Sequence, residues 1–290
     1  MQTFQNIRYA YVVLKRYEVN ILTKSILYNA FRCIGCRACQ VACKRWNELK
    51  AEKTSLGETW TNPPDLSSNT WNIIKIIELK EGEEVKMHFS TYRCMHCLEP
   101  ICVKVCPPRA IMKDPETGAV VINSERCVGC LACVEACPFK IPRFERGLGT
   151  RKCTLCLDRL ELGLKPACVE VCPTEALEFD ERNKIVERAK QLASETRGYL
   201  YGIEEAGGTG VIMVLTASPE KLGLPIVAKK VYEVPEVMPI KTVTEAIQPT
   251  LSSESLRNIA IGGLAIIAVG AVAAIIARRR TREIESKETP

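Results

Sequence analysis

The chemistry of this 290-residue sequence is concentrated in its sixteen cysteines. They form four groups of four with none left over, and each group begins with C-x2-C and ends with C-x3-C. Thiolates at these short spacings fit a turn that leads into a helix, from which they can ligate several irons of one iron–sulfur cluster. In chain order the groups are Cys33, Cys36, Cys39 and Cys43; Cys94, Cys97, Cys102 and Cys106; Cys127, Cys130, Cys133 and Cys137; and Cys153, Cys156, Cys168 and Cys172.

The third group has the spacing C-x2-C-x2-C-x3-C-P, which is typical of a [4Fe–4S] cubane in bacterial ferredoxins. Gly129 allows the loop to turn tightly and to bring backbone amides near the cluster sulfurs. Pro138 ends the short helix that carries Cys133 and Cys137, so the last thiolate of the group projects away from the loop. In two-cluster ferredoxins that last cysteine ligates the other cluster, so one such group predicts a partner group.

Applied to all four groups, this rule predicts four [4Fe–4S] clusters, with all sixteen cysteines as iron ligands. The expected fold is α+β, with two ferredoxin-like 2[4Fe–4S] units, insertions between them and one C-terminal transmembrane helix. Each predicted site combines three cysteines of one group with the last cysteine of another. Site 1 is Cys33, Cys36, Cys39 and Cys172; site 2 is Cys94, Cys97, Cys102 and Cys137; site 3 is Cys127, Cys130, Cys133 and Cys106; site 4 is Cys153, Cys156, Cys168 and Cys43.

Other uses of cysteine fit this pattern less well. A disulfide framework needs no C-x2-C rhythm. Structural zinc uses two separated C-x2-C knuckles, not three closely spaced cysteines followed by a fourth. The formal net charge of +6 counts every cysteine as neutral. Sixteen thiolates and four cores of about +2 each would bring the holoprotein to about −2. The basic excess therefore compensates cluster charge and does not indicate nucleic-acid binding.

Between the cysteine groups the sequence predicts short strands and helices. A helix expected at 38–53 would turn Trp46 inward, and a helix at 180–192 would be capped by Asp180. His96, between two cysteines, is expected in an exposed turn. Strands are predicted at 71–79 and 85–89 as an inserted hairpin, in a second hairpin within 110–122, and at 211–215 after a turn at 207–210.

The apolar segment 259–277 contains nineteen uncharged residues, enough to cross a membrane. Four arginines follow it within 278–282, whereas Arg257 alone lies close before it. The positive-inside rule then predicts a single-pass membrane protein with a cytoplasmic C-terminus and its cluster domain on the outer, periplasmic face. The predicted organisation is an N-terminal extension at 1–22, a double ferredoxin-like domain at 23–180, a helix and irregular partner-binding arm at 181–250, a transmembrane anchor at 251–280 and a cytoplasmic tail at 281–290.

No catalytic constellation accompanies these motifs. The sequence contains two histidines, His88 and His96, and neither belongs to an arrangement typical of an enzyme site. The apolar segment contains no histidine, so it cannot supply an axial histidine to a haem. Four relays without a substrate site describe an electron-transfer protein, whose donor and acceptor belong to other chains.

The order and spacing of the cysteine groups, including eleven residues between Cys156 and Cys168, resemble the iron–sulfur beta subunits of membrane-bound respiratory formate dehydrogenases. Further similar stretches are 33–43, 91–97, and the glycine-rich 207–210 followed by 222–225. The single C-terminal span is similar too. The resemblance covers about residues 23 to 280, and the first twenty-odd residues depart from it.

This resemblance implies an electron-transfer subunit with no catalytic site of its own. Its electrons would come from a molybdopterin-containing catalytic alpha subunit with Mo or W, and would pass to a cytochrome b gamma subunit and to quinone. The cysteine groups alone specify a broader class. The alternatives are the iron–sulfur subunit of another molybdopterin oxidoreductase, acting on polysulfide, thiosulfate or a sulfoxide, or of a membrane hydrogenase. A membrane-tethered polyferredoxin is a further alternative.

Overall fold

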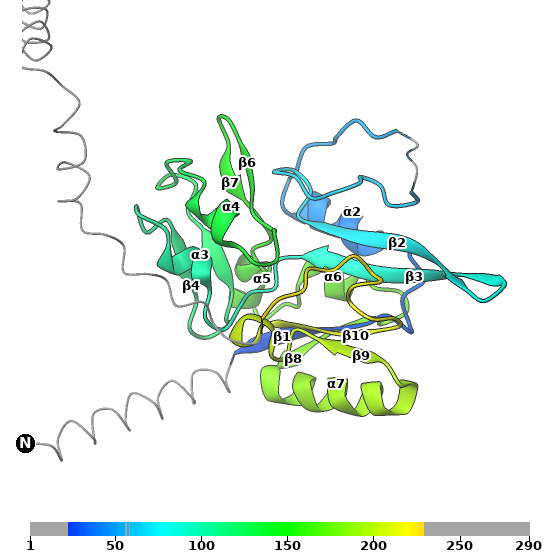
Figure 1. Ribbon diagram of the computed structural model, residues 1–290. Helices are drawn as coiled ribbons and strands as arrows, with labels where there is room; N and C mark the ends of the chain where they lie inside the picture. The colour runs from blue at the N-terminus through cyan, green and yellow to red at the C-terminus, as the bar shows by residue number, and fades with distance from the viewer. Residues whose placement is uncertain (1–22, 56, 58, 229–290) are drawn as a thin grey trace, which may run out of the picture. The chain divides into compact units, whose positions relative to one another are not determined.

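The computed structural model describes residues 23–55, 57 and 59–228, which belong to one compact unit (Figure 1). The predicted N-terminal extension, the arm beyond residue 228, the predicted membrane anchor and the predicted tail lie outside these residues. Within the residues that the structure describes, no helix is both long enough and apolar enough to span a membrane.

A four-stranded sheet joins the beginning and the end of the described chain. Its strand order is β8-β1-β10-β9, in which β1 is parallel to β10, and both outer pairs are antiparallel. The central strands have the sequences KSILYN and VIMVL and are almost fully buried, as apolar strands covered on both faces should be. The bounds are β1 (Lys24–Asn29), β8 (Leu177–Glu181), β9 (Tyr199–Tyr201), β10 (Val211–Leu215) and, after β8, helix α7 (Arg182–Thr196).

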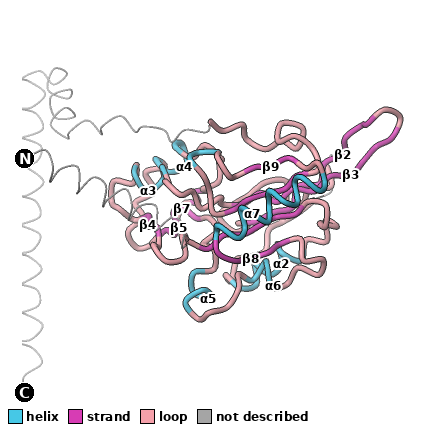
Figure 2. Tube along the Cα trace, turned by 90° about the horizontal axis from the view of Figure 1, so that it is seen from below, coloured by secondary structure: helices cyan, strands magenta, loops and turns pink. Residues whose placement is uncertain are grey.

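Helix α7 covers one face of this sheet, and the cysteine-bearing elements lie on the other (Figures 1 and 2). Ile185, Ala189 and Leu192, spaced four and three residues apart, form the apolar stripe that packs on β1 and β10. Tyr28 and Met213 belong instead to the main core on the opposite face. The sheet is therefore a platform on which the cysteine segments are mounted.

Three antiparallel hairpins complete the β structure. The long β2–β3 hairpin, the central β4–β5 hairpin and strand β10 confirm the strands predicted from the sequence. The third hairpin, β6–β7, follows the third cysteine group and was not predicted. The bounds are β2 (Asn72–Glu81), β3 (Glu84–Arg93), β4 (Ile111–Lys113), β5 (Val120–Ile122), β6 (Arg143–Glu145) and β7 (Gly149–Arg151).

Four short helices carry the third cysteine of each group, and these helices pack in two pairs. Helix α2 packs against α6, and α3 packs against α4. The two pairs lie apart in both views, with α3 and α4 toward one end of the unit (Figures 1 and 2). This arrangement separates the first and fourth cysteine groups from the second and third. The bounds are α2 (Ala38–Trp46), α3 (Ile101–Lys104), α4 (Ala132–Ala136), α5 (Leu157–Glu161), α6 (Ala167–Glu170) and the 3₁₀ turn η1 (Glu205–Gly207).

Two helix predictions were wrong in detail. Helix α2 ends at Trp46, which is 40% exposed rather than inward-facing; its indole N–H donates a hydrogen bond of 2.7 Å to Asp158. Asp180 does not cap a helix. It pairs with Ser25 inside the sheet, and its carboxylate accepts the amide of Glu181 at 2.7 Å. Strand pairing thus extends past the residue that the sequence pattern favoured as the helix start.

The segment 181–228 shares the sheet and the core of the cysteine-bearing part. Strands β9 and β10 complete the sheet that β1 begins, so no structural boundary falls at residue 180. The irregular stretch after β10 is anchored by Leu222 and Leu224, both buried in the main core. Tyr201 fixes it further, because its hydroxyl donates a hydrogen bond of 2.7 Å to the carbonyl of Pro225.

Candidate iron–sulfur sites

The same turn opens all four cysteine groups. The residue before the second cysteine has a left-handed backbone in each case, and this conformation makes successive amides converge on one side of the loop. At Gly35 and Gly129 a side chain would also collide with an aromatic ring, since a Cβ would lie 2.5 Å from Phe89 and 2.8 Å from Phe144. The four φ values are 67° at Gly35, 46° at His96, 69° at Gly129 and 60° at Leu155.

The third cysteine of every group is the second residue of a short helix. Cys39 occupies this position in α2, Cys102 in α3, Cys133 in α4 and Cys168 in α6. In the last three cases the helix ends within one or two residues of the fourth cysteine, so the chain leaves the helix there. The local fold thus separates the fourth thiol from the other three of its group.

Two cavities are lined by four cysteines each. One cavity contains the thiols of site 2, and the other contains those of site 3. In both, three thiols come from one group and the fourth from the neighbouring group, through the packed pair α3 and α4. Apolar side chains, including Ile101 and Phe139 in the first cavity and Ile111 in the second, complete the walls.

The thiols of sites 1 and 4 gather around α2 and α6. Burial raises the pKa of Cys43, and the nearby thiols of Cys153, Cys168 and Cys156 raise it further. Burial likewise raises the pKa of Cys33, with an additional contribution from Cys172. Thiols of the first and fourth groups therefore lie near one another, as the predicted sites 1 and 4 require.

Burial makes these sulfurs poor thiolates on their own. It raises the pKa of Cys39, Cys102 and Cys156 to about 12, and neighbouring thiols add to the shift. A cationic iron core would remove this penalty, because ligation requires the deprotonated sulfur and supplies compensating charge. The donor set, the buried cavities and the convergent amides therefore fit [4Fe–4S] clusters.

Among the residues that the structure describes, no three or more His, Cys, Asp or Glu side chains converge closely enough to hold a single metal ion. The four cysteines of site 2 instead surround one cavity, and the four of site 3 surround another. A cavity between the sulfurs is what a multi-iron core requires, since iron and sulfide atoms occupy the space between the thiolates.

Two buried cations lie among the sites. Arg93 is 2% exposed and donates hydrogen bonds to the sulfurs of Cys168 and Cys153, at 3.0 Å and 3.3 Å. Its Nε lacks a protein partner although it is buried. Lys152 is 5% exposed and lines the cavity of site 2. The sequence analysis missed both residues.

His96 is buried, so the exposed turn predicted for it was wrong. It is 1% exposed, and its Nδ1 accepts a hydrogen bond of 2.9 Å from the amide of Val120. Burial, followed by the nearby charges of Lys152 and Arg93, holds its pKa well below the usual range. The neutral ring thus ties the turn of the second group to strand β5.

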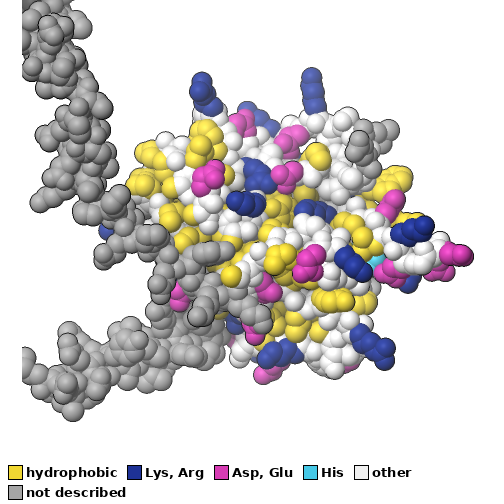
Figure 3. Space-filling model, in the orientation of Figure 1, with side chains coloured by type: hydrophobic (Ala, Val, Ile, Leu, Met, Phe, Trp, Pro, Cys, Tyr) yellow, Lys and Arg dark blue, Asp and Glu magenta, His cyan; other side chains and the backbone are white. Residues whose placement is uncertain are grey.

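Exposure differs sharply among the sixteen cysteines. Cys36 and Cys130 are exposed, and the other fourteen are buried or half-buried. Each exposed cysteine lies in a loop with an exposed apolar side chain: Ile34, 61% exposed, at site 1, and Val128, 71% exposed, at site 3. Apolar side chains also reach the surface at the end of the unit formed by α3 and α4 (Figure 3). Sites 1 and 3 therefore each have one exposed cysteine, whereas site 2 has none and all four cysteines of site 4 are buried.

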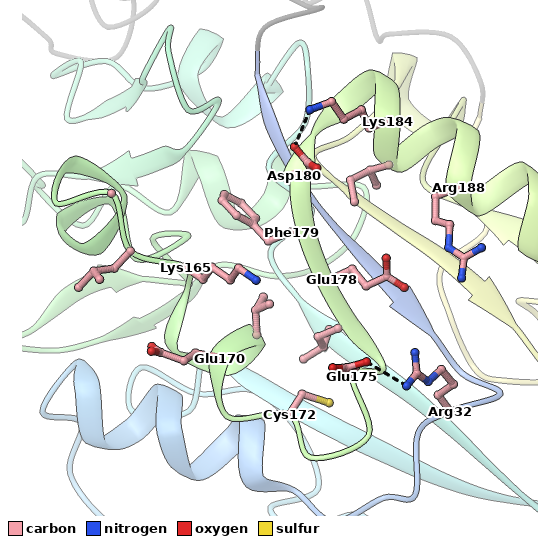
Figure 4. A pocket seen from close by; sticks show the side chains of 15 residues that line it. Arg32, Lys165, Glu170, Cys172, Glu175, Glu178, Phe179, Asp180, Lys184 and Arg188 are labelled. Carbon is pink, nitrogen blue, oxygen red and sulfur yellow. Dashed lines mark hydrogen bonds and ion pairs between the residues drawn. The ribbon is translucent and has the colours of Figure 1, made fainter.

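A charged groove lies beside site 1, between α6, β8 and α7 (Figure 4). Cys172 lines it, so the groove brings solvent to a ligand of this site. Its charges are largely paired: Arg32 bonds to Glu175 at 3.1 Å, and Lys184 bonds to Asp180 at 3.4 Å. The groove therefore carries no strong charge of one sign for a small ionic ligand.

The sequence matches two family models, both described as a 4Fe-4S dicluster domain, over residues 32–110 and 85–182. Among curated proteins it is 38% identical to "Formate dehydrogenase, nitrate-inducible, iron-sulfur subunit" of Escherichia coli strain K12, over 65% of this chain and 67% of that one. The formate dehydrogenase iron-sulfur subunit of Haemophilus influenzae is 36% identical over 65% of this chain and 63% of its own length. "Hydrogenase-2 operon protein HybA" of Escherichia coli O157:H7 is 34% identical over 69% and 72%. The aligned region thus spans about two thirds of these relatives.

The paired cysteine sites and the dicluster matches define a ferredoxin-type electron-transfer protein with [4Fe–4S] clusters. Within that class, the chain belongs to the family of formate dehydrogenase iron–sulfur subunits. In this family the iron–sulfur subunit transfers electrons and does not carry the catalytic site.

Proposed function

We propose that this chain relays electrons from a molybdopterin-containing catalytic subunit that oxidises formate to a membrane cytochrome b subunit and quinone. The sixteen cysteines would hold four [4Fe–4S] clusters at sites 1 to 4, each of which accepts and donates one electron at a time. Oxidation of one formate yields carbon dioxide, one proton and two electrons. The electrons cross this chain singly, and quinone takes both together with two protons.

The contrast in exposure between the sites is the observation that carries this proposal. A relay needs one accessible site for the donor and another for the acceptor, with interior sites between them. The loops of Cys36 and Cys130 have this accessibility, and each presents an apolar side chain suited to a protein interface. Site 1 is therefore the entrance or exit on one side, and site 3 is its counterpart.

The neighbourhood of the thiols supports the order 1–4–2–3. After burial, the thiol of Cys168 contributes most to the raised pKa of Cys39, which supports a position of site 4 beside site 1. Arg93 and Lys152 connect sites 4 and 2. Among the thiols that raise the pKa of Cys102 is Cys133, a ligand of site 3. We assign site 1 to the catalytic subunit and site 3 to the cytochrome.

The membrane attachment belongs to the proposal as well. The segment 251–280, with arginines after its apolar stretch, would anchor the chain with its C-terminus in the cytoplasm. Gly270 and Ala274 would allow a helix of the cytochrome to pack closely. The cluster-bearing unit would then lie on the periplasmic face.

Rapid-freeze EPR of the native complex tests the donor. Formate should reduce the clusters within turnover, and a quinone analogue should then reoxidise them. The match to the hydrogenase-2 operon protein makes a membrane hydrogenase the second candidate. Cluster signals that stay silent with formate and develop with hydrogen would assign the chain to that complex instead.

A further inference from the structure

A basic residue directly precedes the first cysteine of every group, but the four differ in burial. Arg32 and Arg126 are exposed, whereas Arg93 and Lys152 are 2% and 5% exposed. Burying a cation costs free energy unless an opposite charge or hydrogen-bond acceptors compensate it. The two buried residues must therefore be explained by the groups that they face.

Arg93 faces a site to which it is not attached. It is joined by a peptide bond to Cys94, a ligand of site 2. Its two terminal nitrogens nevertheless donate to the sulfurs of Cys168 and Cys153, both of site 4.

Lys152 shows the reverse arrangement. It is joined to Cys153 of site 4, yet it lines the cavity of site 2. The thiols of Cys94 and Cys102 line the same cavity. Its ammonium also donates to the carbonyl oxygens of Val120 and Cys153.

Among the residues that the structure describes, neither cation has a carboxylate partner. Within residues 23–55, 57 and 59–228, the salt bridges involve other side chains. In the described part of the chain, the charges of Arg93 and Lys152 are therefore compensated only by cysteine sulfurs and backbone carbonyls. Such an environment suits a charge that answers the anionic cysteine ligands of a cluster.

We propose that Arg93 and Lys152 are reciprocal positioning charges at the junction of the two ferredoxin-like units: each is attached to a ligand of one site and favours reduction at the other. The inference rests on the proposed relay function. Reduction adds one electron to a site already surrounded by four thiolates, so a fixed positive charge nearby stabilises the reduced state. The step transfers one electron and needs no proton or further reactant.

The arrangement also places one residue between the two sites. The side chain of Arg93 bonds to Cys168, and its backbone continues directly into Cys94. Sites 4 and 2 belong to different ferredoxin-like units, so without such residues their reduction potentials could differ widely. Arg93 raises the reduction potential of site 4, and Lys152 raises that of site 2. Electron transfer between the two sites therefore does not become strongly unfavourable.

A mediator-poised EPR titration of the full native complex, without formate, tests the pair. Arg93→Met should disfavour reduction at site 4 at least tenfold, which is about 59 mV for a one-electron couple. Lys152→Met should do the same at site 2. Signals are assigned by Cys156→Ala and Cys102→Ala, which each remove one site. Arg126→Met changes an exposed residue at the same motif position. It should change the reduction equilibrium of no site by more than about twofold.

Conservative variants separate charge from structure. Arg93→Lys should restore most of the lost potential, whereas Arg93→Gln, which keeps N–H donors without the charge, should resemble Arg93→Met. Equal potentials in Arg93→Gln and the unmodified protein would overturn the inference, even if Arg93→Met failed to load iron. So would a shift confined to site 2 in Arg93→Met. Because mediators replace the donor, shifted potentials in a complex that ignores formate would retain this inference and reject the proposed function.

Discussion

The backbone amide of Val120 donates a hydrogen bond of 2.9 Å to Nδ1 of His96, and both residues are about 1% exposed. This bond fastens the turn between Cys94 and Cys97 to the central hairpin. Because the donor is buried, losing its acceptor leaves an amide unsatisfied, at a cost of about 1–3 kcal/mol.

His96→Leu is accordingly expected to lower the temperature at which the clusters are lost by several degrees. His96→Asn is the matched variant, since its amide oxygen can take the position of Nδ1 and accept the same bond. Visible absorption of the clusters during heating measures both. Equal losses in the two variants would show that ring volume, and not the hydrogen bond, matters here.

Gly202 should be less tolerant of substitution than Gly82, although both have positive φ. At Gly202 (φ 97°) a Cβ would lie 2.3 Å from the carbonyl oxygen of Val211, whereas at Gly82 (φ 68°) no atom lies within 4 Å. Gly82→Ala should cost about 1 kcal/mol from backbone strain alone. Gly202→Ala must also displace the backbone of β10 beside Met95, so its thermal midpoint should fall much further in the same heating experiment.

The cysteine turns could be predicted because their geometry is local: a ligand spacing of three residues fixes a turn wherever it occurs. The sheet could not be predicted, because β1 pairs with β10 from the far end of the described chain. Neither strand's sequence indicates which strand it pairs with. The prediction of an exposed His96 was wrong for the same reason, because its burial depends on contact with Val120. Arg93 and Lys152 carry a visible signal, the basic residue before each group, but Arg32 and Arg126 carry it too and are exposed.

Iron content of double variants should reveal which cysteines share a cluster. The native protein should contain about sixteen irons and sixteen sulfides, and loss of one site should leave about twelve. Cys94→Ala combined with Cys137→Ala should still leave about twelve irons, because both belong to site 2. Cys127→Ala combined with Cys137→Ala should leave about eight, since two sites are lost. The opposite pattern would assign Cys137 to the cluster of its own group.

Deletion of residues 251–290 should release the chain from the membrane fraction when it is produced without a cytochrome partner. No cysteine lies beyond Cys172, so the iron content of the released protein should be unchanged. Iron assay and fractionation of the same sample check both parts. A truncated chain that stays with the membrane would refute the anchor, and one that loses iron would implicate the C-terminal segment in folding.

A charge placed at each accessible loop should separate the two ends of the relay. Ile34→Asp and Val128→Asp alter side chains that are 61% and 71% exposed, so neither should affect folding or iron content by much. An aspartate buried in a protein interface is costly because its charge must be desolvated. With site 1 at the catalytic subunit, Ile34→Asp should slow cluster reduction by formate about tenfold or more and leave reoxidation by quinone unchanged. Val128→Asp should do the reverse.

Stopped-flow absorption of the native complex measures both rates, and Met112→Asp, at a half-exposed residue of β4 outside both loops, is the control. Exchanged effects of the two variants would invert the direction of the relay, and equal effects on both rates would reject the assignment of separate ends.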